Sequence, residues 1–537
     1  MDSHISMERE TLVTEIIYSP YESAQIISIS KEEALTIKGV HSVITADDIP
    51  GENNILGQYG NCRLFAEEQV EYKGQILAVI LAENSDIAKN AVSFVCVEYK
   101  PLPPVRDIEE AVNFNSSHES LKEYESTSET VNSDKLNYVK TTQIIPDYFL
   151  EKVQFTVIAE PNDEGGISIN KNNFDLVIYR SSLNILLSLE SDKIFFNPSD
   201  DQPSPTPFDL IDLSICGIAS LCALISKKKV SVSSYCSKNG AKRLGHGGVE
   251  LVSTIGYGAD GKIGSVKSKM KLDSGSQSGM SGLLWLGFCN VIKQLNHCSN
   301  FDLLCDRCKT NEVPNGSNTY DGAWLGLLVL EETFHQIALK SSKTLSEVRS
   351  NNLDVDDSFE KLEPIYKEKK ELIKETNNSD KNIKKGINLI YLTTNCGLSS
   401  KGEGENVCGA ALTEVELDMR KKSIRLVYCN IIQHVDRSSS KNQQRAFAVT
   451  SFISGLKKIN VFDESNSENL LKKGSFTQIF PDELYCRTIP RNDCSLMIPY
   501  CLSLSAYFAI YDAMSEFDRE FSYHELTHFS MFMEERV

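Results

Sequence analysis

The stretch that decides the fold reads Gly39-Val-His-Ser-Val-Ile-Thr-Ala-Asp-Asp-Ile-Pro-Gly51, then Leu64-Phe-Ala-Glu-Glu-Gln-Val-Glu-Tyr-Lys-Gly-Gln-Ile-Leu-Ala-Val-Ile-Leu-Ala82, then Phe94-Val-Cys-Val-Glu-Tyr-Lys-Pro-Leu-Pro-Pro104. The β-branched residues of its first part favour a strand, and Asp, Pro and Gly around position 50 favour a turn. The continuous apolar run Ile76–Leu81 is typical of a strand that is buried on both faces. Ser85 is expected to cap a following helix, and the prolines from Pro101 onward should end a last strand.

This order of strand, turn, strand, helix and strand resembles the small α/β hammerhead domain of the molybdenum hydroxylases, the family of xanthine dehydrogenases and aldehyde oxidases. Later segments resemble the same family: Cys308–Asn311 before a helical pattern at Trp324–Leu339, an alternating strand at Cys408–Asp418, and a final helix at Phe508–Met514. The resemblance implies an α+β fold, in which an α/β hammerhead domain is followed by a mixed-sheet molybdopterin-binding-like domain.

The resemblance also divides the chain. Residues 1–113 are expected to form the hammerhead-like domain, and residues 114–135, rich in Ser, Glu, Asn and Thr, a linker. Residues 136–360 should form a first molybdopterin-binding-like subdomain. A charged connection at 361–386, read as an exposed helix and a loop, should lead to a second such subdomain with the tail at 387–537.

Composition excludes several classes of partner. The chain has 537 residues and a net charge of −19, which disfavours nucleic acid and anionic membrane surfaces alike. The longest apolar stretch, Leu213–Ser226, is too short to cross a bilayer and is better explained as a buried helix. The first thirty residues include Asp2, Glu8 and Glu10 and no apolar core of a secretory signal. With 15 cysteines and no such signal, we expect reduced thiols and a cytoplasmic location.

An active member of the family binds molybdenum through a pterin, and the protein supplies backbone amides and a carboxylate base. Its glycine-rich loop has the character Gly-Gly-Phe-Gly-Gly-Lys, and the best match here is Thr206-Pro-Phe-Asp-Leu-Ile211. By this resemblance Phe208 and Asp212 are the candidate cofactor-binding residues. The glycines are missing, however, and Pro207 has no amide hydrogen with which to hold an anion.

Two further family motifs are also altered. An Arg-Gly-Phe-Gly-type segment that orients substrate corresponds to Asn318–Trp324, where Asp321 reverses the charge. A Gly-Gln-x-Glu-Gly-Ala segment corresponds to Ala446–Ser451, where apolar Phe447 and Val449 replace the Gln and Glu. These changes predict a weakened grip on both pterin and substrate.

The motif that decides turnover is Gly-Glu-Pro-Pro, which carries the family's base. Counting back from the final helix, this chain has Leu496-Met-Ile-Pro499, with Met497 at the position of the carboxylate. A thioether cannot accept a proton at any relevant pH, and Asp493 is the one nearby substitute. No cysteine set has the ferredoxin spacing of the family's iron–sulfur regions.

The sequence therefore predicts a degenerate molybdenum-hydroxylase-like protein that retains no molybdenum cofactor, has no assigned catalytic residue and acts by binding or by forming a homodimer, as the resemblance implies. The alternative is an active molybdopterin-dependent oxidoreductase that hydroxylates small aldehydes or N-heterocycles. Whether the chain is an enzyme stays open at this point.

A second alternative comes from the tail. His524-Glu-Leu-Thr-His528 fits the H-E-x-x-H pattern of zinc peptidases, in which Glu525 would act as base between two zinc ligands, His524 and His528. Few residues follow to supply a third ligand, so an amphipathic tail helix is the simpler interpretation. The single Cys305-x-x-Cys308 pair lacks a second half and predicts two ordinary thiols beside a core helix.

Overall fold

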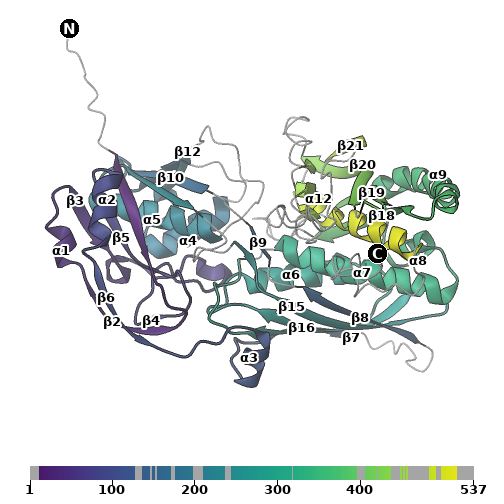
Figure 1. The fold of residues 1–537 in the computed structure, drawn as a ribbon, viewed down its shortest axis with the longest axis horizontal. Coiled ribbons are helices and arrows are strands. Elements are labelled where there is room, and N and C mark those ends of the chain that lie inside the picture. The colour runs from purple at the N-terminus through teal and green to yellow at the C-terminus, as the bar shows by residue number, and fades with distance from the viewer. Residues whose placement is uncertain are drawn as a thin grey trace, which may run out of the picture.

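The chain folds into two lobes that lie side by side (Figure 1). The computed structural model describes residues 11–126, 136–145, 148–150, 154–170, 176–197, 210–235, 244–316, 319–395, 406–418, 420–421, 423–436, 448–449, 451–453, 455–456, 483–491 and 497–516. The lobes have separate apolar cores, one of which lies under the amino-terminal sheets and the other between the carboxy-terminal sheets. The architecture is α+β, as the sequence predicts.

The first lobe is built on a seven-stranded mixed sheet. Its strand order is β12 (Ile194–Asn197), β11 (Ile167–Asn170), β10 (Gln154–Pro161), β13 (Val230–Tyr235), β1 (Leu12–Tyr18), β5 (Ile76–Ala82) and β3 (Val40–Ile44). A smaller sheet has the order β4 (Gln69–Val70), β2 (Ala24–Ser30) and β6 (Cys96–Pro101). The large sheet therefore combines strands that precede residues 114–135 in the sequence with strands that follow them.

Strand β5 explains why the hammerhead stretch is so apolar. All of its residues are buried, and they alternate between cores: Val79 and Leu81 face the main cluster of the lobe, whereas Ala78 and Ile80 face a small cluster under α2 (Ser85–Val92). Helix α2 begins one residue earlier than expected. Its N-cap is Asn84, not Ser85, and the Asn84 side chain accepts a hydrogen bond from the Ile87 amide at 3.0 Å.

Short and long helices complete the first lobe and its border. They are α1 (Glu32–Leu35), α3 (Ile108–Asn113), α4 (Leu176–Leu187) and α5 (Leu210–Ser226), with the 3₁₀ helices η1 (Ala46–Asp48), η2 (Gly57–Tyr59) and η4 (Ser191–Lys193). Helix α5 is the buried helix that the apolar stretch predicts, and it packs on β10 and β13. In the described part of the chain, no helix is both long and apolar enough to cross a membrane.

The second lobe begins with a five-stranded sheet whose order is β7 (Leu121–Ser126), β17 (Asn300–Cys308), β16 (Ile263–Asp273), β15 (Val249–Tyr257) and β8 (Asn137–Ile145). A two-stranded pair, β9 (Tyr148–Leu150) with β14 (Leu244–His246), lies beside it. A hairpin turn joins β15 to β16, and Gly261 adopts a φ of +81° there, a conformation that glycine adopts without strain.

Strand β7 corrects one expectation, since it lies inside the predicted linker. Leu121–Ser126 pairs with β17 at the edge of the sheet. Its polar composition is that of an edge strand with one face in water. Lys293 on the neighbouring helix contacts two of its carboxylates, Glu123 at 2.7 Å and Glu125 at 3.2 Å. Ionic contacts therefore stabilise a strand whose sequence resembles a loop.

A second sheet closes the lobe. Its order is β18 (Ile383–Asn395), β19 (Asn406–Asp418), β20 (Ser423–Asp436) and β21 (Glu483–Arg491). The predicted charged connection differs from expectation in part: α9 (Asp357–Ser379) is an amphipathic helix that packs on this sheet, and the expected loop is short, because β18 already begins at Ile383. Phe359, Leu362 and Tyr366 on its apolar face are buried.

Between the two sheets of the second lobe lies a layer of helices (Figure 1). They are α6 (Ser281–Ile292), α7 (Thr319–Ser341), α8 (Leu345–Asn352), α12 (Met497–Leu502) and α13 (Leu504–Ser515). Helices α6 and α7 cross so closely that a Cβ at Gly322 would lie 1.7 Å from the Leu284 carbonyl oxygen. This helical layer positions the motifs considered next.

Candidate functional site

Two of the altered family motifs meet at the junction of α7 and α12. Asp321 lies in the first turn of α7, and Tyr500 lies in α12. The Tyr500 hydroxyl donates a hydrogen bond to Asp321 Oδ1 at 2.7 Å, and Cys501 Sγ lies 3.6 Å from the Tyr320 carbonyl oxygen. The two residues that directly follow the segment expected to carry the base therefore contact the segment expected to orient substrate.

The segment that follows the third motif packs against the same helix. A Cβ at Gly455, which follows the Ala446–Ser451 motif, would lie 2.3 Å from both the Tyr500 carbonyl oxygen and Ser503 Oγ. On the other side, a Cβ at Gly409 in β19 would lie 2.6 Å from Ile498 Cγ2. Helix α12 is therefore held between a strand and a helical segment at close range, with Ile498 fully buried.

The glycine in the substrate-orienting motif serves packing and not anion binding. Gly322 is inside α7 and faces the Leu284 carbonyl on α6, while Gly287 on α6 faces Thr319 in the same way. Both positions exclude a side chain because the helix backbones touch there. Asp321 beside them is an anion in the first helical turn, where the helix dipole favours negative charge.

The described residues of these motifs do not fit a molybdopterin. They present the Asp321 carboxylate, the Tyr500 hydroxyl and the Cys501 thiol at the junction, and among Thr319–Trp324, Ala448, Val449, Ser451 and Met497–Pro499 there is no Lys, Arg or His. An anionic pterin would therefore meet a carboxylate where the family places positive charge and open amides. No reaction step through a molybdenum cofactor can be derived from this arrangement.

The remaining candidate residues lie elsewhere. Phe208 falls outside the described residues, as do Asp493 and the tail residues His524, Glu525 and His528. Asp212 is described: it is 3% exposed in α5 and accepts a hydrogen bond from the Tyr179 hydroxyl on α4 at 2.6 Å. That bond joins two helices of the first lobe, whereas the α7/α12 junction belongs to the second lobe. Asp212 thus has a structural contact that its sequence position did not predict.

The Cys-x-x-Cys pair consists of two buried thiols on β17. Cys305 and Cys308 are both free, and burial raises the pKa of the Cys308 thiol to about 11. Across the described ranges, no group of three or more His, Cys, Asp or Glu side chains is placed to hold a metal ion. The described part of the chain thus offers no metal site around this pair.

A buried ion pair on α7 was missed at the sequence level. The Arg349 guanidinium on α8 donates to Glu331 through Nε at 3.0 Å and through Nη2 at 2.5 Å, and both side chains are fully buried. Arg349 Nη2 also lies 3.4 Å from Asn388 Oδ1 on β18. The available signal was Glu331 inside a run of apolar residues, because a carboxylate buried there requires a partner.

Glu332 and His335 extend this polar group across α7. Burial raises the pKa of Glu332 to about 7, against hydrogen bonds from Gln143 on β8 and from Gln336 that favour the charged form. Burial, reinforced by the Arg349 and Lys370 charges, lowers the pKa of His335 well below its usual value, so that imidazole is neutral. It stacks on Phe508 of α13 with ring centroids 5.2 Å apart.

Comparison with known proteins agrees with this fold. The family model described as "Aldehyde oxidase and xanthine dehydrogenase, a/b hammerhead domain" matches residues 2–103. Indole-3-acetaldehyde oxidase of Zea mays is 22% identical over 429 residues, which are 72% of this chain and 31% of that protein. Aldehyde oxidase 4 of Cavia porcellus is 37% identical over 108 residues, which are 20% of this chain and 8% of that protein. This chain thus spans less than a third of the length of these relatives.

The fold has known structural neighbours. The aldehyde oxidoreductase from Desulfovibrio gigas superposes with a TM-score of 0.74 at 14% identity and covers 95% of this chain and 75% of its own. This likeness shows a shared fold. The hammerhead match over residues 2–103 and the sequence similarity to these relatives both point to the molybdenum hydroxylase family, that of the aldehyde oxidases and xanthine dehydrogenases. The zinc-peptidase alternative has no support from these relatives.

Proposed function

We propose that the protein is a non-catalytic member of the aldehyde oxidase and xanthine dehydrogenase family, which keeps the scaffold without a molybdenum cofactor. The observation that carries the proposal is the contact between Tyr500 and Asp321. It joins the helix that begins at the expected base position, Met497, to the substrate-orienting segment, and that segment carries a carboxylate where the family needs positive charge.

Two sequence substitutions support the same proposal. Met497 occupies the expected base position at the start of α12, and a thioether provides no proton acceptor for attack on a substrate. Pro207 and Asp209 replace residues of a glycine-rich loop, so an amide hydrogen is lost and a like charge is added. Each change alone weakens turnover, and together they remove base, cofactor grip and substrate orientation.

A folded scaffold without turnover can still bind another protein, and we propose that this chain functions by assembling with a second copy of itself. The family resemblance favours a homodimer. Sedimentation equilibrium of the purified chain tests this part of the proposal: a mass near twice 60.0 kDa supports it, and a monomer at every concentration contradicts it.

Turnover tests the non-catalytic proposal. Purified protein from a host that makes molybdopterin would be assayed with aromatic aldehydes and N-heterocycles, with ferricyanide as electron acceptor. We expect no oxidation above the protein-free rate, whereas an active aldehyde oxidase in the same assay gives the positive control. Conversion of an aldehyde to its acid would instead support the alternative of an active oxidoreductase. The family relationship by itself favours that alternative.

A further inference from the structure

The two lobes are connected mainly by polar contacts. The second lobe contributes two described residues to the apolar core of the first lobe, Met280 and Leu283 at the start of α6. Other contacts across this boundary are hydrogen bonds and ion pairs between the loops before and after β4 and two loops of the second lobe, together with two hydrogen bonds between Val105 and Asn311 at 2.6 and 2.8 Å. These residues form what we term the interlobe joint, namely Asn61, Arg63, Glu71, Gln277, Gly279, Lys309 and Asn311.

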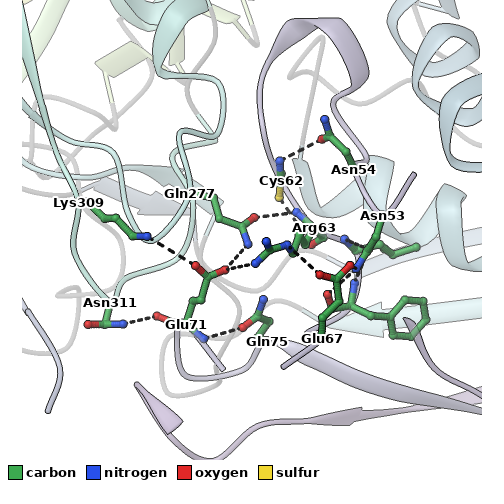
Figure 2. Close-up of polar contacts among 12 residues, drawn as sticks. Asn53, Asn54, Cys62, Arg63, Glu67, Glu71, Gln75, Gln277, Lys309 and Asn311 are labelled. Carbon is green, nitrogen blue, oxygen red and sulfur yellow. Dashed lines mark hydrogen bonds and ion pairs between the residues drawn. The ribbon is translucent and has the colours of Figure 1, made fainter. Parts of the chain in front are cut away.

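Glu71 is the centre of the interlobe joint (Figure 2). Its carboxylate accepts hydrogen bonds from Gln277 Nε2 at 2.5 Å and Arg63 Nη1 at 3.2 Å, and its other oxygen lies 3.7 Å from Lys309 Nζ. Its backbone carbonyl accepts a bond from Asn311 Nδ2 at 2.7 Å. The Glu71 side chain is 12% exposed, so a single carboxylate joins three segments that lie far apart in the sequence.

The second lobe also contacts the backbone of the hammerhead loop. Gln277 Oε1 accepts a hydrogen bond from the Arg63 amide at 2.7 Å, and Gly279 forms a β-bridge with Asn61. A Cβ at Gly60 would lie 2.1 Å from the Gly279 carbonyl oxygen, so the two backbones touch. The Gln277 side chain thus bridges Arg63 and Glu71, and fixes the position of both.

Glu67 provides a built-in comparison. It lies 3.5 Å from the same arginine, Arg63, but accepts its other bond from Asn53 within the first lobe. Its side chain is 43% exposed. Glu67 therefore shares the charge and an ionic partner of Glu71, but Figure 2 shows it bonded within the first lobe, whereas Glu71 also contacts Gln277 and Lys309 of the second lobe.

We infer that Glu71 fixes the angle between the two lobes, and that loss of its ionic contacts lets them move as two bodies around the apolar contact at Met280 and Leu283. A polar joint can open because water replaces each broken hydrogen bond, whereas separating an apolar core would expose buried surface. Since the apolar cores of the two lobes are otherwise distinct, opening the joint leaves both lobes folded.

Hydrogen exchange and small-angle scattering of the full chain test this inference. In Glu71→Ala, amides in 60–63 and 274–279 should exchange at least about tenfold faster, while β5 and β16 keep their protection and the radius of gyration rises. The control, Glu67→Ala, should leave both measurements as in the wild type. Unchanged exchange and scattering in Glu71→Ala, or equal effects of the two variants, would overturn the inference.

A milder variant covers the case in which Glu71→Ala does not fold. Glu71→Gln keeps an acceptor for Gln277 and the carbonyl that bonds Asn311, but loses the charge that faces Arg63 and Lys309. Raising salt should speed exchange at 60–63 in the wild type, because the Glu71 ion pairs are screened, and should have no such effect in Glu71→Gln. Equal salt dependence in the two proteins would contradict an ionic role for Glu71.

Discussion

Tyr500 donates a hydrogen bond to Asp321 Oδ1 at 2.7 Å and so ties α12 to the first turn of α7. The two residues are 179 positions apart: Asp321 lies inside a motif altered from the family pattern, and Tyr500 directly follows another, Leu496–Pro499. A carboxylate at this position would oppose an anionic cofactor, and the contact predicts that this region contributes to stability.

If that contact is structural, Tyr500→Phe should lower the free energy of unfolding by about 1 kcal/mol, the usual net value of one hydrogen bond. Asp321→Asn should weaken the same bond. Urea unfolding of both single variants and the double variant gives their coupling energy, which should be about 1 kcal/mol and stabilising. Strictly additive losses would mean that the two side chains do not depend on each other.

The α6/α7 crossing predicts a strong effect of one added methyl group. Gly322→Ala places a Cβ 1.7 Å from the Leu284 carbonyl oxygen, and the helices must separate to accept it. We expect a loss of about 2 kcal/mol or more in the free energy of unfolding. The control is Gly282→Ala on α6, where nothing lies within 4 Å of a new Cβ and the change should be neutral or slightly stabilising. A tolerated Gly322→Ala would show that the helices do not touch there.

Glu332 predicts a pH dependence of stability. Burial raises its folded-state pKa from 4.5 to about 7. The stability contributed by the neutral carboxyl is therefore fully present below pH 4.5 and is lost as the pH rises through 7. Glu332→Gln stays neutral, so between pH 5 and 8 the wild type should lose on the order of 3 kcal/mol relative to this variant.

Urea unfolding at several pH values measures that difference, with Glu371→Gln, which changes an exposed carboxylate on α9, as the matched control. A constant gap between wild type and Glu332→Gln from pH 5 to 8 would show that Glu332 does not change its charge in this range.

The buried pair Arg349 and Glu331 should behave as a unit. Arg349→Met leaves the Glu331 carboxylate buried without its cation, and we expect a loss of about 3–5 kcal/mol. Replacing both residues in Glu331→Leu/Arg349→Met should cost far less, because no charge is then left in the core. Thermal unfolding of the two proteins distinguishes these results. If the double variant is as unstable as Arg349→Met, the pair must stabilise the fold by more than the neutralisation of one buried charge by the other.

Local patterns predicted most of the elements. The apolar run of β5 and the helical spacing of α7 each carry their own signal, and each element is present. The predicted element boundaries were wrong where contacts with a distant part of the chain determine the structure. The sequence of β7 resembles a loop because one face of the strand is in water. Its pairing with β17, in which Leu121 lies opposite Cys305, joins segments too far apart in the sequence to be predicted locally.

The site was harder to predict than the fold. The sequence showed that Asp321 and Met497 depart from the family pattern, but not that Tyr500 would bond Asp321 or that Gly322 would serve a helix crossing. Asp212, assigned to a cofactor by position, bonds Tyr179 between α4 and α5. The interlobe joint around Glu71 was not predicted at all, since its members come from three distant loops that only the folded chain brings together.

The central claim is that this scaffold holds no molybdenum cofactor. The most direct test is the molybdenum content of the chain, purified from a host that loads active family members, with the pterin measured in the same sample by fluorescence after oxidation. The account predicts molybdenum and pterin at trace levels relative to protein. One molybdenum and one pterin for each chain would contradict it.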